Sequence, residues 1–286
     1  METKKNKLSH TRLQTYLTCP YKYWLYYDKK LRPKATKSAL VFGAAMDEAL
    51  NELLQSKDLD KSKERLSYKL NHPIVNDTPI ILAENLDLIK FSKTDLQPAL
   101  SEDPIKCLEL KGNILLDEYN KKIIPKIKEV ISVQETIKIE NDDGDSIIGI
   151  IDMIVKWKDN KTYLLDNKTT SVKYDKDSPS KSDQLLLYHL IKQSEVDIDK
   201  IGFIVLNKKI RKDLSCDIDV ILKPTSKISL DSELEVLKKF NDVNEGIHKR
   251  EFKRNYKNCR GVYGYCDYFN YCHKKDDSNL VSKSNE

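Results

Sequence analysis

The sequence predicts an α/β or α+β core flanked by helical segments. Two observations lead to this prediction: apolar residues recur at helical spacing in several stretches before residue 125, and alternating or β-branched stretches follow from residue 131 onward. With 39% hydrophobic and 33% charged residues, a chain of 286 residues can bury a core of its own.

Helices are expected where apolar residues repeat every three to four positions. Ser9 is a candidate N-cap of the first helix, and Pro20 should break that stretch into two pieces. Residues 57–100 are charged and weakly periodic, so we expect only helices and loops there. The expected helices span residues 9–31, 38–56, 105–124, 182–194 and 231–249.

Strands are expected where β-branched and apolar residues alternate or run together. The turn sequences NDDGD and KDNK separate the first three strands, which should therefore form an antiparallel trio. The expected strands span residues 131–140, 146–157, 162–170, 201–208 and 216–222.

Charge and leader signals limit the classes of function. The net charge is +5, from 50 basic and 45 acidic residues, which permits a polyanionic partner without demanding one. No stretch approaches the roughly 20 apolar residues of a membrane span, and the first ten residues lack the apolar run of a secretory signal. We therefore expect a cytoplasmic protein without a membrane partner, in which clustered thiols bind metal in preference to forming disulfides.

Two aspartates interrupt apolar strands and are candidate metal ligands. If residues 158–161 turn a hairpin, Asp152 and Asp166 lie opposite one another to within about one residue, and a divalent cation would relieve their repulsion. Lys168 shares the face of Asp166, whereas Asn167 points to the other face and offers only its backbone carbonyl. Alternatively, Asp166 and Lys168 are a surface pair on an exposed strand.

These residues resemble the PD-(D/E)XK nuclease superfamily in its RecB-like branch. The Gly-x-x-Asp motif falls on Gly149–Asp152, Asp-x-Lys on Asp166–Lys168, and Gln-x-x-x-Tyr on Gln184–Tyr188. The resemblance implies a restriction-endonuclease-like α/β core, with a mixed central sheet flanked by helices, and Mg²⁺ or Mn²⁺ as cofactor. The implied catalytic residues are Asp152, Asp166, Lys168, Gln184 and Tyr188, and the implied metal ligands are Asp47, Asp152, Asp166 and Asn167.

Asp47 is a departure from the family pattern. RecB-like nucleases carry Gly-x-x-x-His, and here the match is Gly43 to Asp47, with a carboxylate in the histidine position. Oxygen ligands suit Mg²⁺ and Mn²⁺, so Asp47 can still bind metal. Glu48 could serve instead, or Asp47 could be an acid that faces solvent. Glu135 matches a commonly acidic position in the family.

The cysteines resemble the iron–sulfur ligands of AddB-type nucleases. Those proteins use one N-terminal and three C-terminal cysteines, which correspond here to Cys19, Cys259, Cys266 and Cys272. The gap between the last two matches the family's C-x5-C, but six residues stand where the family has two between the earlier pair. Ten of the fifteen tyrosines flank the two cysteine clusters, which would sheathe a [4Fe–4S] cluster. Zn²⁺ is the alternative, with His273 as a possible substitute ligand.

The remaining cysteines, Cys107 and Cys216, lie in apolar segments and are expected as small core residues. For the domains we expect a flexible N-terminus at 1–8, a single nuclease domain over 9–273 and a disordered tail at 274–286. Within that domain we expect a helical insertion at 57–125, a catalytic core at 130–225, and a metal-stapled helical subdomain formed by Cys19 with residues 255–273.

The resemblance implies a metal-dependent deoxyribonuclease. By analogy it would be an exonuclease in recombination, repair or the processing of phage or foreign DNA, and its DNA would be single-stranded or have a free end. Candidate phosphate contacts are the basic stretches at residues 4–7, 29–34, 207–212 and 248–254. One alternative is an inactive DNA-binding module. The other is a zinc-stapled nuclease or scaffold subunit that acts only within a helicase complex. Because the sequence lacks a Walker motif, any ATP-driven unwinding would have to come from a partner.

Overall fold

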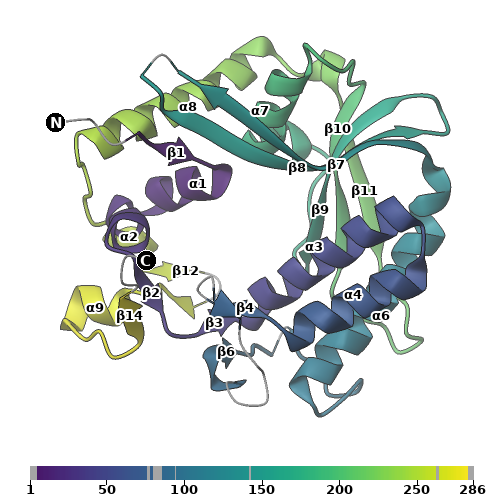
Figure 1. Ribbon diagram of the computed structural model, residues 1–286, viewed down its shortest axis with the longest axis horizontal. Helices are drawn as coiled ribbons and strands as arrows, with labels where there is room; N and C mark the ends of the chain where they lie inside the picture. Colours follow the sequence, from purple (N-terminus) through teal and green to yellow (C-terminus); the bar gives the residue numbers. More distant parts are fainter. Residues whose placement is uncertain are drawn as a thin grey trace. The chain divides into compact units, whose positions relative to one another are not determined.

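The computed structural model describes residues 5–75, 78–79, 86–93, 95–141, 143–261 and 264–282 (Figure 1). The chain divides into two compact units, in place of the single domain expected over residues 9–273. The first unit comprises Met1–Thr36, Lys138–Gly149 and Leu234–Glu286, and the second comprises Lys37–Ile137 and Ile150–Glu233.

A mixed β-sheet forms the centre of the second unit (Figure 1). Strand β8 pairs with β9 antiparallel, β9 with β10 parallel, and β10 with β11 antiparallel, while β7 pairs with β8. The mixed sheet that the sequence resemblance implies is therefore confirmed. The strands are β7 (Ile127–Glu140), β8 (Ser146–Trp157), β9 (Thr162–Thr170), β10 (Lys200–Asn207) and β11 (Ile218–Pro224).

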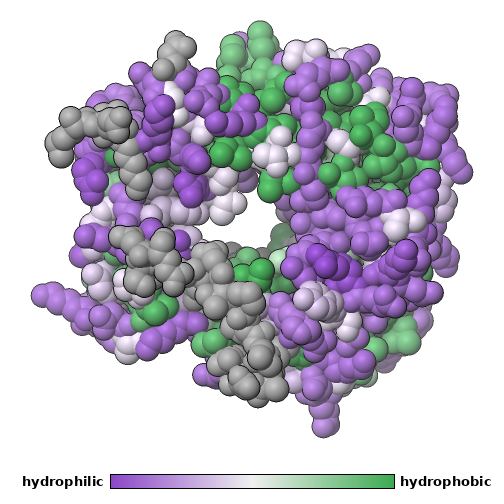
Figure 2. Space-filling model, viewed as in Figure 1, coloured by the Kyte–Doolittle hydropathy of each residue, from purple (hydrophilic) through white to green (hydrophobic). Residues whose placement is uncertain are grey.

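Helices supply much of the apolar core of the second unit. The apolar side chains of α3 repeat at helical spacing and are buried in a cluster that Leu66 and Leu115 also join. Side chains of Asp58 and Asp103 cap the next two helices by accepting backbone N–H groups. Figure 2 shows that the outward surface over these helices, at the lower right, is mostly hydrophilic. The helices are α3 (Ser38–Ser56), α4 (Leu59–Asn71), α6 (Pro104–Lys122) and α7 (Asp183–Lys192).

Residues 57–125, expected as a helical insertion, contribute two helices to this core. Leu66 of α4 and Leu115 of α6 are fully buried in the same cluster as the apolar face of α3. In α4 the charged residues obscure the periodicity, because only one face of that helix is apolar. The short elements of the unit are β4 (Ile74–Val75), β5 (Thr78–Pro79), β6 (Ile89–Lys90), and 3-10 turns at Leu86–Leu88, Ile124–Lys126, Pro179–Lys181 and Thr225–Lys227.

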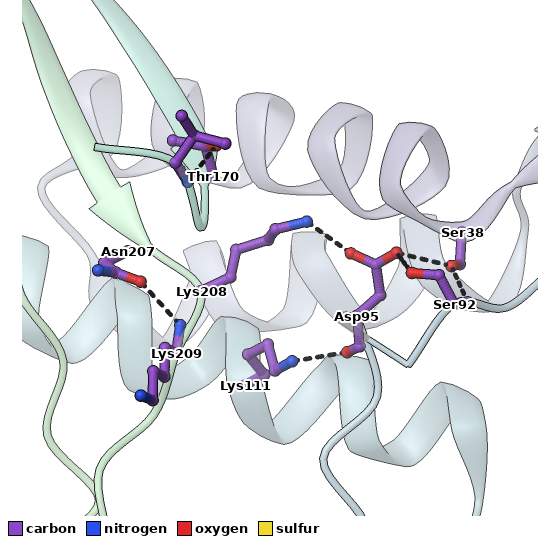
Figure 3. Close-up of polar contacts among 9 residues, drawn as sticks. Ser38, Ser92, Asp95, Lys111, Thr170, Asn207, Lys208 and Lys209 are labelled. Carbon is purple, nitrogen blue, oxygen red and sulfur yellow. Dashed lines mark hydrogen bonds and ion pairs between the residues drawn. The ribbon is translucent and has the colours of Figure 1, made fainter. Parts of the chain in front are cut away.

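A buried ionic cluster fixes the loop between β6 and α6 (Figure 3). Asp95, which is 2% exposed, accepts from Lys208 Nζ at 2.5 Å and from Ser38 Oγ at 3.1 Å. Lys111 Nζ donates to the backbone carbonyl of Asp95 at 2.6 Å. The loop is thereby tied to the start of α3, to α6 and to the end of β10. Lys208 is buried here, so it does not belong to the basic surface expected at 207–212.

The first unit is built from short elements near both chain ends. Ser9 caps α1 by accepting from the backbone N–H of Arg12, and Pro20 starts α2, as the sequence predicts. The helices are α1 (His10–Thr18), α2 (Pro20–Tyr23), a π-helix at Trp24–Asp28, α9 (Phe269–Lys274), a 3-10 turn at Tyr256–Asn258, and α8 (Leu230–His248), which begins in the second unit. The strands are β1 (Lys7–Leu8), β2 (Leu31–Pro33), β12 (Arg260–Gly261), β13 (Gly264–Tyr265) and β14 (Leu280–Ser282), and β3 (Thr36–Lys37) lies at the boundary of the two units.

Both chain ends carry more structure than expected. Strand β1 pairs parallel with the start of β8 and buries Leu8, so residues 7–8 are not a flexible arm. Strand β14 pairs antiparallel with β2 and buries Leu280, so the expected disordered tail is wrong up to residue 282. Residues 283–286 lie outside the described part of the chain. Short polar segments gain order here from distant partner strands, which local composition does not reveal.

In the described part of the chain, no helix has the length and apolarity that a bilayer crossing requires.

Candidate active site

The hairpin of β8 and β9 brings two aspartates together. Its ladder pairs Met153 with Leu165. One step further along the ladder, Asp152 lies across from Asp166. The backbone N–H of Asn167 donates to Asp152 Oδ2 at 2.9 Å, which ties the first carboxyl group to the second strand. The hairpin predicted from the turn sequence is therefore confirmed.

Lys168 forms a buried ion pair with Asp166. Lys168 Nζ lies 2.6 Å from Asp166 Oδ2, and the side chains are 30% and 3% exposed. Burial raises the pKa of the Asp166 carboxyl, although the neighbouring ammonium acts in the opposite direction. Burial alone would lower the pKa of Lys168, but the charges of Asp166 and Asp152 raise it overall. The ammonium group therefore stays positive, and it is directed at the two carboxyl groups.

Helix α3 adds a third carboxyl group, that of Asp47. Burial is the largest cause that raises its pKa, to about 6, and the negative charge of Asp166 is the next. Glu48 also contributes, while Lys168 lowers the value. The charges of the hairpin therefore act directly on the carboxyl group of Asp47.

Asp152 shows most clearly how much negative charge is gathered here. Burial, followed by repulsion from Asp166 and Asp47, raises its pKa to about 8. The N–H of Asn167 and the charge of Lys168 oppose this shift without cancelling it. Three carboxyl groups thus share one ammonium group, and a further positive charge would stabilise all three in their ionised forms.

Helix α7 holds the lysine from the other side. Ser182 caps the helix by accepting from the N–H of Leu185, which fixes where its first turn lies. Lys168 Nζ donates to Gln184 Oε1 at 3.2 Å, and Gln184 Nε2 donates to the Tyr188 hydroxyl at 3.2 Å. The i, i+4 spacing expected to put Gln184 and Tyr188 on one helical face does so, and together they orient the ammonium group of Lys168.

Asn167 has a side-chain environment that the sequence does not reveal. Its Oδ1 accepts from the Tyr119 hydroxyl of α6 at 3.3 Å, and its Nδ2 is buried without a hydrogen-bond partner. The side chain thus points away from Asp166 and Lys168, as expected from strand alternation. Tyr119 is fully buried, and burial together with the charge of Asp152 raises its pKa. No sequence signal distinguishes this tyrosine from an ordinary core residue.

Gln134 of β7 is a second residue that sequence reasoning missed. Its Nε2 lies 3.5 Å from Asp47 Oδ1 and 3.4 Å from Asn51 Oδ1, so it contacts one of the three carboxyl groups of the hairpin and α3. A glutamine in a strand is ordinarily a solvated side chain, and nothing in the sequence marks it.

Two acidic residues weighed from the sequence have partners elsewhere. Glu48 forms ion pairs with Arg65 and Lys69 of α4, both at 2.5 Å, and so is not available as the ligand in place of Asp47. Glu135 pairs with Lys192 of α7 at 2.6 Å. Neither residue joins the group formed by the three aspartates.

The three aspartates offer oxygen donors for a metal ion. Among the residues that the structure describes, no three His, Cys, Asp or Glu side chains form a group that could hold a metal as they stand. The chemistry of Asp47, Asp152 and Asp166 nevertheless fits a hard divalent cation, because burial raises the pKa of all three carboxyl groups and repulsion from neighbouring carboxylates adds to it at Asp47 and Asp152. Carboxylate and carbonyl oxygens are the ligands that Mg²⁺ prefers.

The first unit gathers the four cysteines expected to bind a cluster. The Asn255 backbone approaches two of them: its N–H donates to Cys19 Sγ at 3.5 Å, and its carbonyl accepts from Cys259 Sγ at 3.9 Å. Burial raises the pKa of Cys272 to about 11, with further contributions from the other three thiols, Cys266 among them. Tyr21, Trp24, Tyr26 and Tyr271 pack in the same hydrophobic cluster as Cys266 and Cys272. Two of the four thiols, those of Cys266 and Cys272, therefore lie among aromatic side chains, and the described residues include no group of three ready to hold a metal.

Cys107 and Cys216 lie in the second unit and are almost completely buried. Cys107 Sγ donates to the backbone carbonyl of Gln97 at 3.2 Å. The expectation of small core residues at these two positions is confirmed.

Comparison with known proteins identifies the family. The solved structure of a protein named "Putative exonuclease", from Eubacterium rectale, superposes with a TM-score of 0.53 at 11% identity, over 98% of this chain and 91% of that chain. This similarity shows a shared fold. A second structure, of a protein named SSO0001, has a TM-score of 0.35 at 15% identity over 96% of this chain and 88% of that chain, which is too low to argue from. No curated protein sequence matches. The family model described as the PD-(D/E)XK nuclease superfamily matches residues 7–273, and the chain therefore belongs to that superfamily.

Proposed function

We propose that this protein is a Mg²⁺- or Mn²⁺-dependent deoxyribonuclease that removes nucleotides from free DNA ends. The observation that carries the proposal is the meeting of Asp47, Asp152 and Asp166 around a single lysine in the second unit. Membership of a nuclease superfamily supports phosphodiester hydrolysis. The similarity to a protein named as an exonuclease supports action at ends, though only as an analogy.

The residues that would hold the ion are Asp47, Asp152 and Asp166, with the backbone carbonyl of Asn167. When bound, such an ion polarises a phosphoryl oxygen and acidifies a water molecule. The three carboxylates provide the negative charge that selects a divalent cation. The two strands and α3 keep the three carboxyl groups within electrostatic reach of one another, and their side chains must still turn toward an ion to bind it.

Lys168 is proposed to stabilise the negative charge that develops on the scissile phosphate. Its side chain is 30% exposed, which leaves the lysine accessible to a phosphate, while Asp166 and Gln184 fix the direction of the ammonium group. Tyr188 holds Gln184 through its hydroxyl. Gln184 and Tyr188 are therefore assigned the task of orienting the lysine.

The loop between β9 and α7 is the best candidate for a DNA backbone contact within the second unit. It joins the strand of Asp166 to the helix of Gln184, and its lysines Lys173, Lys176 and Lys181 are exposed. Phosphate contacts from such lysines would be salt-dependent and independent of sequence.

A [4Fe–4S] cluster bound by Cys19, Cys259, Cys266 and Cys272 is proposed for the first unit, with Zn²⁺ as the alternative. The interacting thiols and their aromatic surroundings support a metal at this position. Its role would be to hold chain segments together that are remote in sequence.

The test compares linear with circular single-stranded DNA in Mg²⁺ or Mn²⁺, using anaerobically purified protein with Asp166→Ala as control. We expect digestion of the linear substrate alone, and its loss in the variant. Digestion of both substrates would replace the exonuclease by an endonuclease. If neither is digested by a folded, metal-loaded protein, the assignment moves to a DNA-binding subunit.

A further inference from the structure

Gln134 has a backbone conformation that its side chain disfavours. It lies inside β7 with a φ of 52°, in the left-handed region that residues other than glycine rarely adopt. A single left-handed residue within a strand is typical of a β-bulge, which bends the strand and redirects a side chain. Strained residues of this kind persist where the surrounding structure holds them, and they are often found at functional sites.

The strained residue directs its amide at α3. Gln134 Nε2 lies 3.5 Å from Asp47 Oδ1 and 3.4 Å from Asn51 Oδ1. Asp47 and Asn51 are one helical turn apart, so they present their oxygens on one face of the helix. An amide nitrogen carries two hydrogens, which allows one to be directed at each oxygen.

These contacts are too weak to account for the strain by their contribution to stability. Both are at the long end of the hydrogen-bond range, and Gln134 is only half-buried, so water could replace the amide. The next residue, Glu135, pairs with Lys192 of α7 and anchors the strand there. The two long contacts offset little of the strain, which points to a functional reason for the conformation.

We propose that Gln134 is a positioning residue for Asp47. Its amide engages Oδ1 and so leaves Oδ2 of the same carboxylate to bind the divalent ion, an inference that rests on the proposed function. Asn51 holds the second hydrogen of the amide and thereby fixes its orientation. When a side chain that hydrogen-bonds to a metal ligand is removed, metal affinity commonly falls by about 10- to 100-fold.

Two substitutions separate positioning from folding. Gln134→Met keeps the size of the side chain and the unfavourable φ but removes the amide. Gln134→Gly removes the amide and also relieves the strain, because glycine adopts positive φ freely. The matched control is Leu214→Gly, at an exposed residue with a φ of 59° remote in sequence from the ligands.

Three measurements are made on the full chain. Calorimetry gives the Mn²⁺ affinity without DNA, thermal unfolding in a chelator gives the stability of the metal-free protein, and cleavage of linear DNA is followed against Mn²⁺ concentration. We expect both Gln134 variants to bind Mn²⁺ about 10- to 100-fold more weakly and to recover most of their maximal rate at high Mn²⁺. Gln134→Gly and Leu214→Gly should both unfold at the same or a higher temperature than the wild type. Leu214→Gly should also keep the Mn²⁺ affinity of the wild type.

Each outcome decides the matter. If the wild type binds Mn²⁺ and cleaves DNA but both Gln134 variants have unchanged affinity, the positioning role is wrong and the proposed function stands. If Gln134→Gly loses affinity and stability together, the residue is merely structural. If the wild type neither binds Mn²⁺ nor cleaves DNA, the proposed function and this inference fail together.

Discussion

At the scale of single residues, the chemistry of the site depends on carboxyl groups buried near one another. Burial and mutual repulsion raise the pKa of Asp152 to about 8 and that of Asp47 to about 6. Near neutral pH the metal-free site therefore retains part of its protons. A divalent ion must displace them, which makes metal binding dependent on pH.

This predicts that the metal-free protein loses stability as the pH rises from 5 to 8. The ordinary value for Asp152 is 3.8, so the unfolded chain is already ionised in this window, whereas the native state must ionise a buried group. The native state binds more protons, and the free energy of unfolding therefore falls with rising pH. Urea unfolding in a chelator at several pH values measures the slope, and added Mn²⁺ should stabilise the protein most at pH 8.

The matched variant for this prediction is Asp152→Asn, which cannot ionise. It should flatten the pH dependence and unfold at higher urea than the wild type at pH 8 without metal. If the unfolding free energy of the wild type changed with pH as little as that of the variant, the pKa of Asp152 would not be raised in the native state.

Single residues also show where sequence reasoning reaches its limit. Asp152, Asp166 and Lys168 could be found because charges inside apolar strands are conspicuous and strand alternation gives their facing. Gln134 and Tyr119 could not, because their roles depend on a positive φ and on a tertiary contact, neither of which has a local pattern.

At the scale of the element, close approach of backbones determines how firmly the sheet is held. A Cβ on Gly202 of β10 would lie 2.4 Å from the backbone oxygen of Ile221 on β11 and 2.7 Å from Leu222 Cδ2. The backbone of a paired strand cannot yield as a flexible side chain can. The absence of a side chain at Gly202 therefore allows β10 and β11 to pair closely.

Gly202→Ala is predicted to destabilise the protein by about 1–3 kcal/mol, because the paired strands must move apart. Chemical denaturation followed by circular dichroism measures the change. Gly43→Ala in α3 is the control: its Cβ meets nothing within 4 Å, and alanine should stabilise the helix by about 0.5–1 kcal/mol. Equal effects at the two glycines would contradict the prediction.

The buried ionic cluster makes a second prediction at this scale. Although burial acts to raise it, the pKa of Asp95 is held low by Lys208 and by the hydroxyl groups of Ser92 and Ser38. Lys208→Met leaves that carboxylate buried without its counter-charge and should cost about 3–5 kcal/mol in the free energy of unfolding. The control is Lys209→Met at the exposed residue that follows, which should change the free energy of unfolding by no more than about 0.5 kcal/mol.

The double variant Lys208→Met with Asp95→Asn supplies the second test of that cluster. Removing both charges should restore part of the lost free energy, because the cost lies in the unpaired carboxylate. Urea unfolding of the single and double variants measures it. No recovery in the double variant would mean that the loss comes from packing.

The elements themselves were largely predictable, and the exceptions have a common cause. The strands β8 and β9 and the helix α3 have the ranges expected from their periodicity. Strand β7 begins four residues earlier than expected, at Ile127, and β14 was not expected at all. Strand β7 pairs with β8, and β14 pairs with β2 from the other end of the chain; such pairing partners leave no local signal in the sequence.

At the scale of the whole molecule, the first unit is assembled from segments far apart in the sequence. It contains both chain ends and the turn between β7 and β8. Resemblance could suggest that Cys19 joins the C-terminal cysteines, but the division of the chain into units could not be anticipated from composition. Each unit carries one of the two candidate sites.

A metal bound by the four cysteines makes a direct prediction. Protein purified without oxygen should contain about four iron atoms per chain, and Cys19→Ser should lower that content. Cys107→Ser, which alters a core cysteine outside the cluster, should retain it. About one zinc per chain would establish the alternative, and the absence of both metals would contradict a metal at this position.

The central claim is that the carboxylates and lysine of the second unit form a metal-dependent nuclease centre. The most direct measurement is the rate of linear single-stranded DNA cleavage in Mn²⁺ by the wild type, Asp166→Asn and Lys168→Met, with Mn²⁺ binding measured on the same samples. The account predicts that both variants lose about 100-fold or more in rate, and that only Asp166→Asn also loses Mn²⁺ affinity. Cleavage at the wild-type rate by Asp166→Asn would contradict it.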